Sequence, residues 1–163
     1  MSYEPTSLYS EIVQNLFMGG TADDDVIHLP AARVKRNDLP FEAIVTMYAW
    51  ARPADWRVQE FRYGVPDAAI ADIDLDRLKQ AVDFGYNRWM AGDRVLVRCQ
   101  AGLNRSGLVT ALILMSTGLD AETAIREIRK NRADIALFNN EYVTWLMTEG
   151  AAFVAPSPSQ QAA

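Results

Sequence analysis

Histidine and cysteine are almost absent from this sequence: His28 and Cys99 are the only examples among 163 residues. A single cysteine excludes a disulfide within the chain and any zinc site built from several cysteines. A single histidine disfavours a histidine-dependent catalytic triad and a histidine-rich metal site. These two absences narrow the enzyme classes open to the chain, and we assign no role to His28.

Long apolar runs are missing as well. The run Ala111–Met115 is far shorter than the roughly 20 residues that cross a bilayer. The first residues, Met1 to Pro5, lack the basic start and apolar stretch of a secretory signal. We therefore expect a cytoplasmic protein without a membrane partner.

An excess of positive charge is the third absence, because the formal net charge is −5. Surfaces that bind nucleic acid need clustered basic residues to neutralise phosphates, so we expect no nucleic-acid partner. One local basic cluster does occur, and we interpret it as the exposed face of a helix: Arg126, Arg129, Lys130 and Arg132.

The residues that are present indicate one compact domain, with 50% hydrophobic and 23% charged residues. Apolar periodicity predicts strands over 15–20, 43–48, 60–65 and 94–98, and helices over 74–90, 106–117, 121–131 and from Asn139 or Asn140 through Met147. Strands separated by helices predict a single α/β domain with a mostly parallel central sheet flanked by helices. We place this domain at residues 7–150 and a flexible C-terminal tail, rich in Pro, Ser and Gln, at 151–163.

The most informative segment runs from the buried strand before Cys99, through a tight loop, into the helix that starts near Arg105. Five residues between Cys99 and Arg105 form a loop whose backbone N–H groups can converge on one anion. Gly102 permits the sharp turn, and the positive end of the helix points at the same place. We predict a phosphate-binding loop made of Gln100, Ala101, Gly102, Leu103, Asn104 and Arg105.

Three side chains of this loop have distinct predicted roles. Cys99 lies where the loop amides and the helix would stabilise a thiolate, which makes it a candidate nucleophile. Arg105 has a planar fork that can hold two phosphoryl oxygens, more tightly as charge redistributes in the transition state. Ser106 can donate a hydrogen bond to the sulfur. We read this group as a catalytic phosphate site, although a lone cysteine without such neighbours is usually a small core residue.

The pattern Cys99-x5-Arg105-Ser106 after an apolar strand resembles the phosphate-binding loop of the cysteine-dependent protein tyrosine phosphatase superfamily, in particular its small dual-specificity type. Leu16-Phe-Met-Gly19 and Asn139-x-x-Tyr142 are similar to further elements of that family. The resemblance implies a protein tyrosine phosphatase-like fold. It also implies hydrolysis of phosphorylated proteins or peptides, phosphotyrosine foremost, through a phosphocysteine intermediate and without metal or cofactor.

Phosphatases of this type use an aspartate upstream of the cysteine as general acid. Asp67, in Val65-Pro66-Asp67, stands 32 residues before Cys99 and is our candidate. Asp72 and Asp74 remain alternatives, although Asp74 is also placed to cap the following helix.

The chain departs from the family at Arg98, where histidine commonly precedes the cysteine. Strand alternation puts the Arg98 side chain opposite that of Val97, and we favour a structural or solvent-facing role over a catalytic one. The departure leaves open a pseudophosphatase that binds phosphorylated partners without turnover. Asn104 before Arg105 leaves open an RNA 5′-triphosphatase, and the loop with Trp50 and Trp56 is a candidate border of the site.

Overall fold

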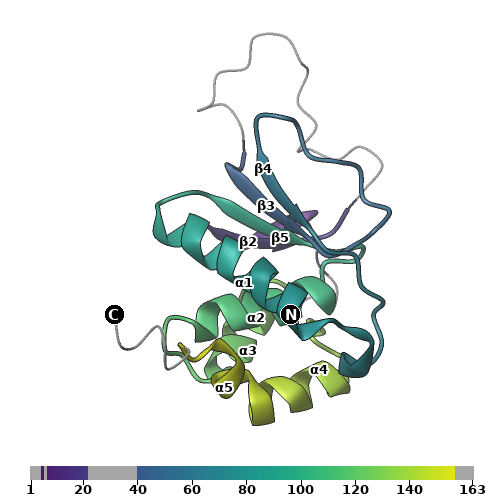
Figure 1. Cartoon of the computed structure of the whole chain (residues 1–163), viewed down its shortest axis with the longest axis vertical. Helices are drawn as coiled ribbons and strands as arrows, with labels where there is room; N and C mark the ends of the chain where they lie inside the picture. Colours follow the sequence, from purple (N-terminus) through teal and green to yellow (C-terminus); the bar gives the residue numbers. More distant parts are fainter. Residues whose placement is uncertain (1–4, 6, 22–39, 157–163) are drawn as a thin grey trace.

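The computed structural model describes residue 5, residues 7–21 and residues 40–156. Five strands form one sheet in the order β1-β2-β5-β3-β4 (Figure 1). Only β1 and β2 pair antiparallel; β2 with β5, β5 with β3 and β3 with β4 are parallel. The strand bounds are β1 Tyr9–Val13, β2 Leu16–Gly19, β3 Ala43–Thr46, β4 Gln59–Arg62 and β5 Val95–Arg98. The predicted α/β domain with a mostly parallel sheet is confirmed.

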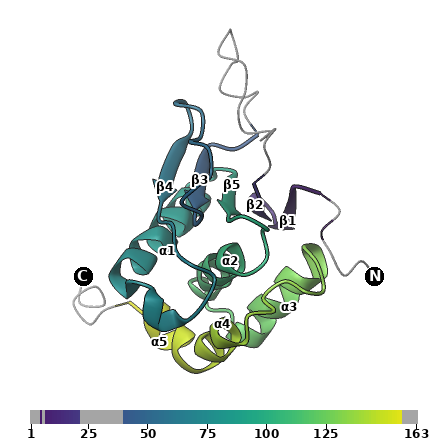
Figure 2. The same cartoon turned by 90° about the vertical axis from the view of Figure 1, so that its right-hand side faces the viewer.

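The helices of the described residues gather on one face of the sheet (Figures 1 and 2). They are the 3-10 helix η2 Ile70–Asp72, α1 Leu75–Met90, α2 Arg105–Met115, α3 Ala121–Asn131, α4 Asn140–Trp145, the π-helix η3 Leu146–Gly150 and α5 Ala151–Val154. As the sequence indicates, Asp74, Asp120 and Asn139 cap α1, α3 and α4 by accepting hydrogen bonds from backbone N–H groups. None of these helices is long and apolar enough to cross a membrane.

The two faces of the sheet carry different cores because strand side chains alternate. Val95, Val97 and Cys99 belong to the main core, which packs against the helices, and every residue of α2 is buried there. Leu96 lies in a smaller cluster on the opposite face with Phe41, Ile44 and Val58. Arg98 therefore projects from the face opposite to Cys99, although the two residues are adjacent in the chain.

The structure adds two elements that the sequence pattern did not indicate. The first is the edge strand β1, in which only Ile12 of five residues is buried and the register shifts between Glu11 and Val13. The second is α5, Ala151–Val154, which lies within the segment expected as a flexible tail. Residues 157–163 lie outside the described residues, as does His28.

Candidate active site

The predicted phosphate-binding loop connects the carboxyl end of β5 to the amino end of α2. Its turn depends on Gly102, which has φ +71°. A Cβ atom at this position would lie 2.4 Å from the backbone C of Gly19 and 2.5 Å from the N of Gly20. Glycine is therefore required both for the left-handed backbone and for the close approach of β2.

The side chains at the base of this loop are buried and close together. Cys99 is 2% exposed and Arg105 is 9% exposed. The Sγ of Cys99 and the Oγ of Ser106 are 3.3 Å apart, within hydrogen-bond distance for sulfur. The sequence expectation that Ser106 can contact the sulfur thus agrees with the geometry. Gln100 and Ala101, at the outer side of the loop, are exposed.

The Arg105 guanidinium is held from two sides. Its Nη1 donates to the carbonyl oxygen of Val65 over 3.1 Å, and its Cζ lies 5.3 Å from the ring centroid of Tyr48. The Nε of Arg105 is buried and has no hydrogen-bond partner among the described residues. A buried cationic N–H group without an acceptor is unfavourable, and an anion in the loop would satisfy it. Sequence reasoning missed Tyr48, since one aromatic residue after a strand carries no distinctive signal.

Of the three candidate acids, the structure brings Asp67 to the loop. Its Oδ2 accepts a hydrogen bond from the Asn104 Nδ2 over 2.8 Å, and its Oδ1 accepts one from the Asn139 Nδ2 over 2.9 Å. Asp74 instead caps α1, with Oδ1 accepting from the backbone N of Asp76 and Arg77. Asp72 is exposed within η2.

The segment that carries Asp67 is fastened at further points. The Tyr142 hydroxyl donates to the carbonyl oxygen of Pro66 over 3.1 Å, and the Asn139 Nδ2 also donates to that of Ala68 over 2.9 Å. Burial, and secondarily the charge of Asp67, raise the pKa of Tyr142 to about 12, so this hydroxyl keeps its proton at neutral pH. The family-like pair Asn139 and Tyr142 thus holds the Asp67 segment against the loop.

The position of Arg132 shows that the basic cluster of the sequence is not one exposed helix face. This residue is buried, and its Nε donates to the carbonyl oxygen of Gly102 over 3.0 Å while its Nη1 donates to that of Ser7 over 2.8 Å. Burial lowers its pKa, and the nearby Cys99 opposes that effect. Arg129 is also engaged, with carbonyl oxygens of residues 136 and 137. The exposed basic face therefore contains only Arg126 and Lys130 of the four, because Arg129 is half-buried and Arg132 anchors the loop.

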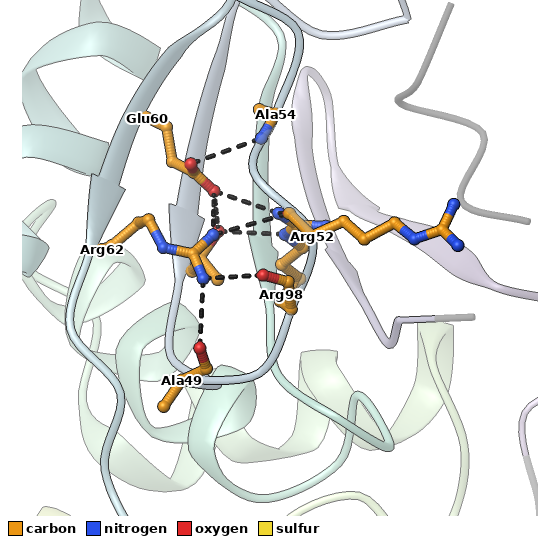
Figure 3. A network of polar contacts seen from close by, with 8 residues as sticks. Ala49, Arg52, Ala54, Glu60, Arg62 and Arg98 are labelled. Atoms are coloured by element: carbon orange, nitrogen blue, oxygen red, sulfur yellow. Dashed lines mark hydrogen bonds and ion pairs between the residues drawn. The ribbon is translucent and has the colours of Figure 1, made fainter. Parts of the chain in front are cut away.

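Arg98 is fully buried, with 0% exposure. Its guanidinium contacts Thr46, Glu60 and the backbone of Arg52 (Figure 3), so the structural alternative holds and the solvent-facing one does not. Trp50 and Trp56 are exposed at 84% and 86% on the loop between β3 and β4. Within the part of the chain that the structure describes, no group of three or more His, Cys, Asp or Glu residues could hold a metal ion.

Comparison with known proteins places this geometry in context. The family described as "Dual specificity phosphatase, catalytic domain" matches residues 37–151. The structure of human DUSP28 is 21% identical and superposes with a TM-score of 0.73, covering 93% of this chain and 99% of that one. Tk-PTP in its active form is 20% identical with a TM-score of 0.70, covering 90% and 98%. No curated protein sequence matches the chain significantly.

Proposed function

The chain belongs to the dual specificity phosphatase catalytic domain family, and from this premise we propose that it is a metal-independent phosphomonoester hydrolase whose nucleophile is Cys99. A phosphate in the loop would accept hydrogen bonds from the backbone N–H groups between Cys99 and Arg105, and it would lie at the positive end of α2. It would also give the unpaired Nε of Arg105 an acceptor.

In the first step, the Cys99 thiolate attacks phosphorus and the bond to the ester oxygen breaks. The leaving oxygen takes the proton carried by Asp67, since expulsion of a free alkoxide or phenoxide is costly. Ser106, whose Oγ lies 3.3 Å from Sγ, stabilises the thiolate before attack and after its return. Arg105 holds two equatorial oxygens as their charge redistributes.

In the second step, the ionised Asp67 takes a proton from a water molecule, whose oxygen attacks the phosphocysteine. The sulfur–phosphorus bond breaks, the thiolate is regenerated and orthophosphate leaves. Each Asp67 oxygen accepts one amide hydrogen bond and keeps a further lone pair that can carry the proton. The amides of Asn104 and Asn139 thus orient the carboxyl group in both steps.

The observation that carries this proposal is the hydrogen bond between Asp67 and Asn104. Asn104 belongs to the loop that begins at Cys99, so the candidate acid and the candidate nucleophile are fastened to one short segment. Asp67 is itself exposed, but its carboxylate is oriented by two amide donors, from Asn104 and Asn139. Asp72 and Asp74 have no comparable connection to the loop among the described contacts.

Family membership supports phosphorylated proteins or peptides as the general substrate class, and we propose phosphotyrosine as the preferred residue. The Cys99 thiol is only 2% exposed and Arg105 only 9%. A phosphoryl group must therefore reach a recessed sulfur, and the long, flat tyrosyl side chain does so more easily than the seryl or threonyl side chain.

The test is release of phosphate by the wild type and by Cys99→Ser from three substrates: a phosphotyrosyl peptide, the matching phosphothreonyl peptide and 5′-triphosphorylated RNA, all with a metal chelator. We expect hydrolysis of the phosphotyrosyl peptide by the wild type alone. Phosphopeptide binding without hydrolysis would instead indicate a pseudophosphatase. Preferential hydrolysis of the RNA, with a steep dependence on salt, would indicate the triphosphatase.

A further inference from the structure

Behind the active site, on the face of the sheet opposite to Cys99, three charged side chains form a network in which Arg98 is buried and Glu60 and Arg62 are partly buried (Figure 3). The Nε of Arg98 donates to the Thr46 Oγ1 over 2.9 Å. The Nη2 of Arg98 donates to the Oε2 of Glu60 over 3.0 Å and to the carbonyl oxygen of Arg52 over 2.6 Å. Arg62 approaches the same carboxylate, with Nη1 3.1 Å from Oε2.

Glu60 remains charged within this network. Burial by itself would raise its pKa, but hydrogen bonds from Thr46 and Arg98 and the charge of Arg62 outweigh burial and lower the pKa below its usual value. One carboxylate is therefore shared by two guanidinium groups, and Arg98 is fully buried. Removal of one partner from such an arrangement leaves an uncompensated buried charge, so the network tolerates few substitutions.

The network fastens a loop rather than a strand. The acceptors on this loop are backbone carbonyl oxygens. That of Arg52 accepts a hydrogen bond from Arg98, and those of Ala51 and Ala49 accept hydrogen bonds from the Nη2 of Arg62 over 2.7 and 3.4 Å. The other oxygen of Glu60, Oε1, accepts from the backbone N of Ala54 over 3.3 Å. Residues 48–54, here called loop 48–54, are thus held from inside the molecule along most of their length.

Loop 48–54 touches the active site at two places. Tyr48, its first residue, lies with its ring 5.3 Å from the Arg105 Cζ. Ala49 packs so closely on Gly64 that a Cβ atom added to Gly64 would lie 2.6 Å from the Ala49 Cβ. Gly64 precedes Val65, whose carbonyl oxygen accepts from Arg105. Both contacts that hold the Arg105 guanidinium in the described residues therefore come from this loop or from the segment packed against it.

We propose that Arg98 is a positioning residue for Arg105, acting through loop 48–54 and not on the thiolate. The proposal rests on the proposed function, since it treats Arg105 as the residue that grips phosphate. Arg98 reaches three acceptors at once through a planar fork. A lysine ammonium carries its three donors on one nitrogen and lacks the planar fork, and an imidazole is shorter, so neither can reproduce these contacts.

The experiment compares Arg98→Met and Arg98→Lys with the wild type. The affinity for inorganic phosphate, measured directly by isothermal titration calorimetry, reports the grip of Arg105, and kcat and KM for para-nitrophenyl phosphate report catalysis. We expect Arg98→Met to weaken phosphate binding and to lower kcat/KM, each by about 10- to 100-fold, as for a displaced binding group. The phosphate affinity and kcat/KM of Arg98→Lys should lie between those of the wild type and those of Arg98→Met. The pH dependence of Cys99 alkylation by iodoacetate should stay as in the wild type, because Arg98 faces away from the sulfur.

The matched control is Arg94→Met. Arg94 also pairs with a glutamate, Glu42, across β5 and β3, but at the opposite end of the strands from the loop. Arg94→Met should lower the free energy of unfolding while leaving phosphate binding within about twofold of the wild type, because this pair lies away from the loop and the Arg105 contacts. Arg98→His, which introduces the residue common in the family, should fall below Arg98→Lys in phosphate affinity.

Two results would overturn the proposal. Wild-type phosphate affinity in folded Arg98→Lys and Arg98→Met would show that the network serves stability alone. A shifted alkylation profile with unchanged phosphate affinity would show that Arg98 acts on the thiolate. If the wild type itself had no turnover, the proposed function would fail, but phosphate affinity would still decide whether Arg98 positions Arg105.

Discussion

Replacement of Asp67 by asparagine tests the division of labour in the site. The substitution removes the proton that the leaving oxygen needs, and general acid catalysis contributes about 10²- to 10⁴-fold to a rate. That range corresponds to about 3 to 5 kcal/mol in the activation free energy. For a phosphotyrosyl peptide, whose leaving phenol has a pKa of about 10, we expect a loss of kcat near the upper end. For an aryl ester with a more acidic leaving group the loss should be smaller.

The structure predicts a second, smaller effect of the same substitution. Both oxygens of Asp67 accept amide N–H groups, from Asn104 and Asn139. An asparagine at position 67 has one oxygen only, so its own NH₂ would face one of these donors. Because Asp67 is exposed, the lost hydrogen bond should lower the free energy of unfolding by only about 0.5 to 1.5 kcal/mol. Asn139→Ala keeps the acid and removes one tether, but it also removes the cap of α4 and the bond to Ala68, so its cost sets an upper limit on this effect.

The assay is steady-state hydrolysis of the phosphotyrosyl peptide between pH 5 and 8, with Asp72→Asn as matched control. Asp72 lies exposed in η2 of the same segment, and its substitution should leave kcat within about twofold. A loss of kcat in Asp72→Asn that equals or exceeds the loss in Asp67→Asn would refute the assignment.

Three further substitutions probe the loop and its supports. Gly102→Ala should cost more than about 3 kcal/mol of unfolding free energy in chemical denaturation, because its Cβ would overlap the backbone of Gly19. Arg132→Met should cost about 3 kcal/mol and weaken phosphate inhibition, since it frees the carbonyl oxygen of Gly102; unchanged phosphate affinity would contradict its anchoring role. Glu60→Gln should cost about 2 kcal/mol at pH 7. Because the folded-state pKa of Glu60 is lowered, this difference should shrink as the pH falls below about 4.3 and vanish below the folded-state pKa; a constant difference down to acid pH would contradict the ionised carboxylate.

The parts of the site that could be predicted from sequence are local in the chain. The loop from Cys99 to Arg105 is recognisable because its glycine, its spacing and the following helix are consecutive. The caps at Asp74, Asp120 and Asn139 follow the same logic, since each side chain bonds to backbone two or three residues on.

The parts that could not be predicted depend on strand order. Arg98 meets Thr46 across 52 residues and Glu60 across 38, because β3 lies between β5 and β4 in the sheet. Arg132 meets Ser10 across 122 residues, in the edge strand β1 that the sequence pattern did not indicate. Helical spacing alone could not separate Arg132 from the exposed Arg126, because both occur in one basic cluster.

The central claim is that a phosphoryl group passes through the Cys99 sulfur, and rapid quenching tests it most directly. The wild type is mixed with the phosphotyrosyl peptide and quenched within the first turnovers. The mass of its proteolytic peptide that contains Cys99 is then measured by mass spectrometry. The account predicts a transient gain of one phosphoryl group on Cys99, a longer-lived one in Asp67→Asn, and none in Cys99→Ser, which should not turn over. Sustained hydrolysis by Cys99→Ser, or turnover in the wild type without any phosphorylated Cys99, would contradict it.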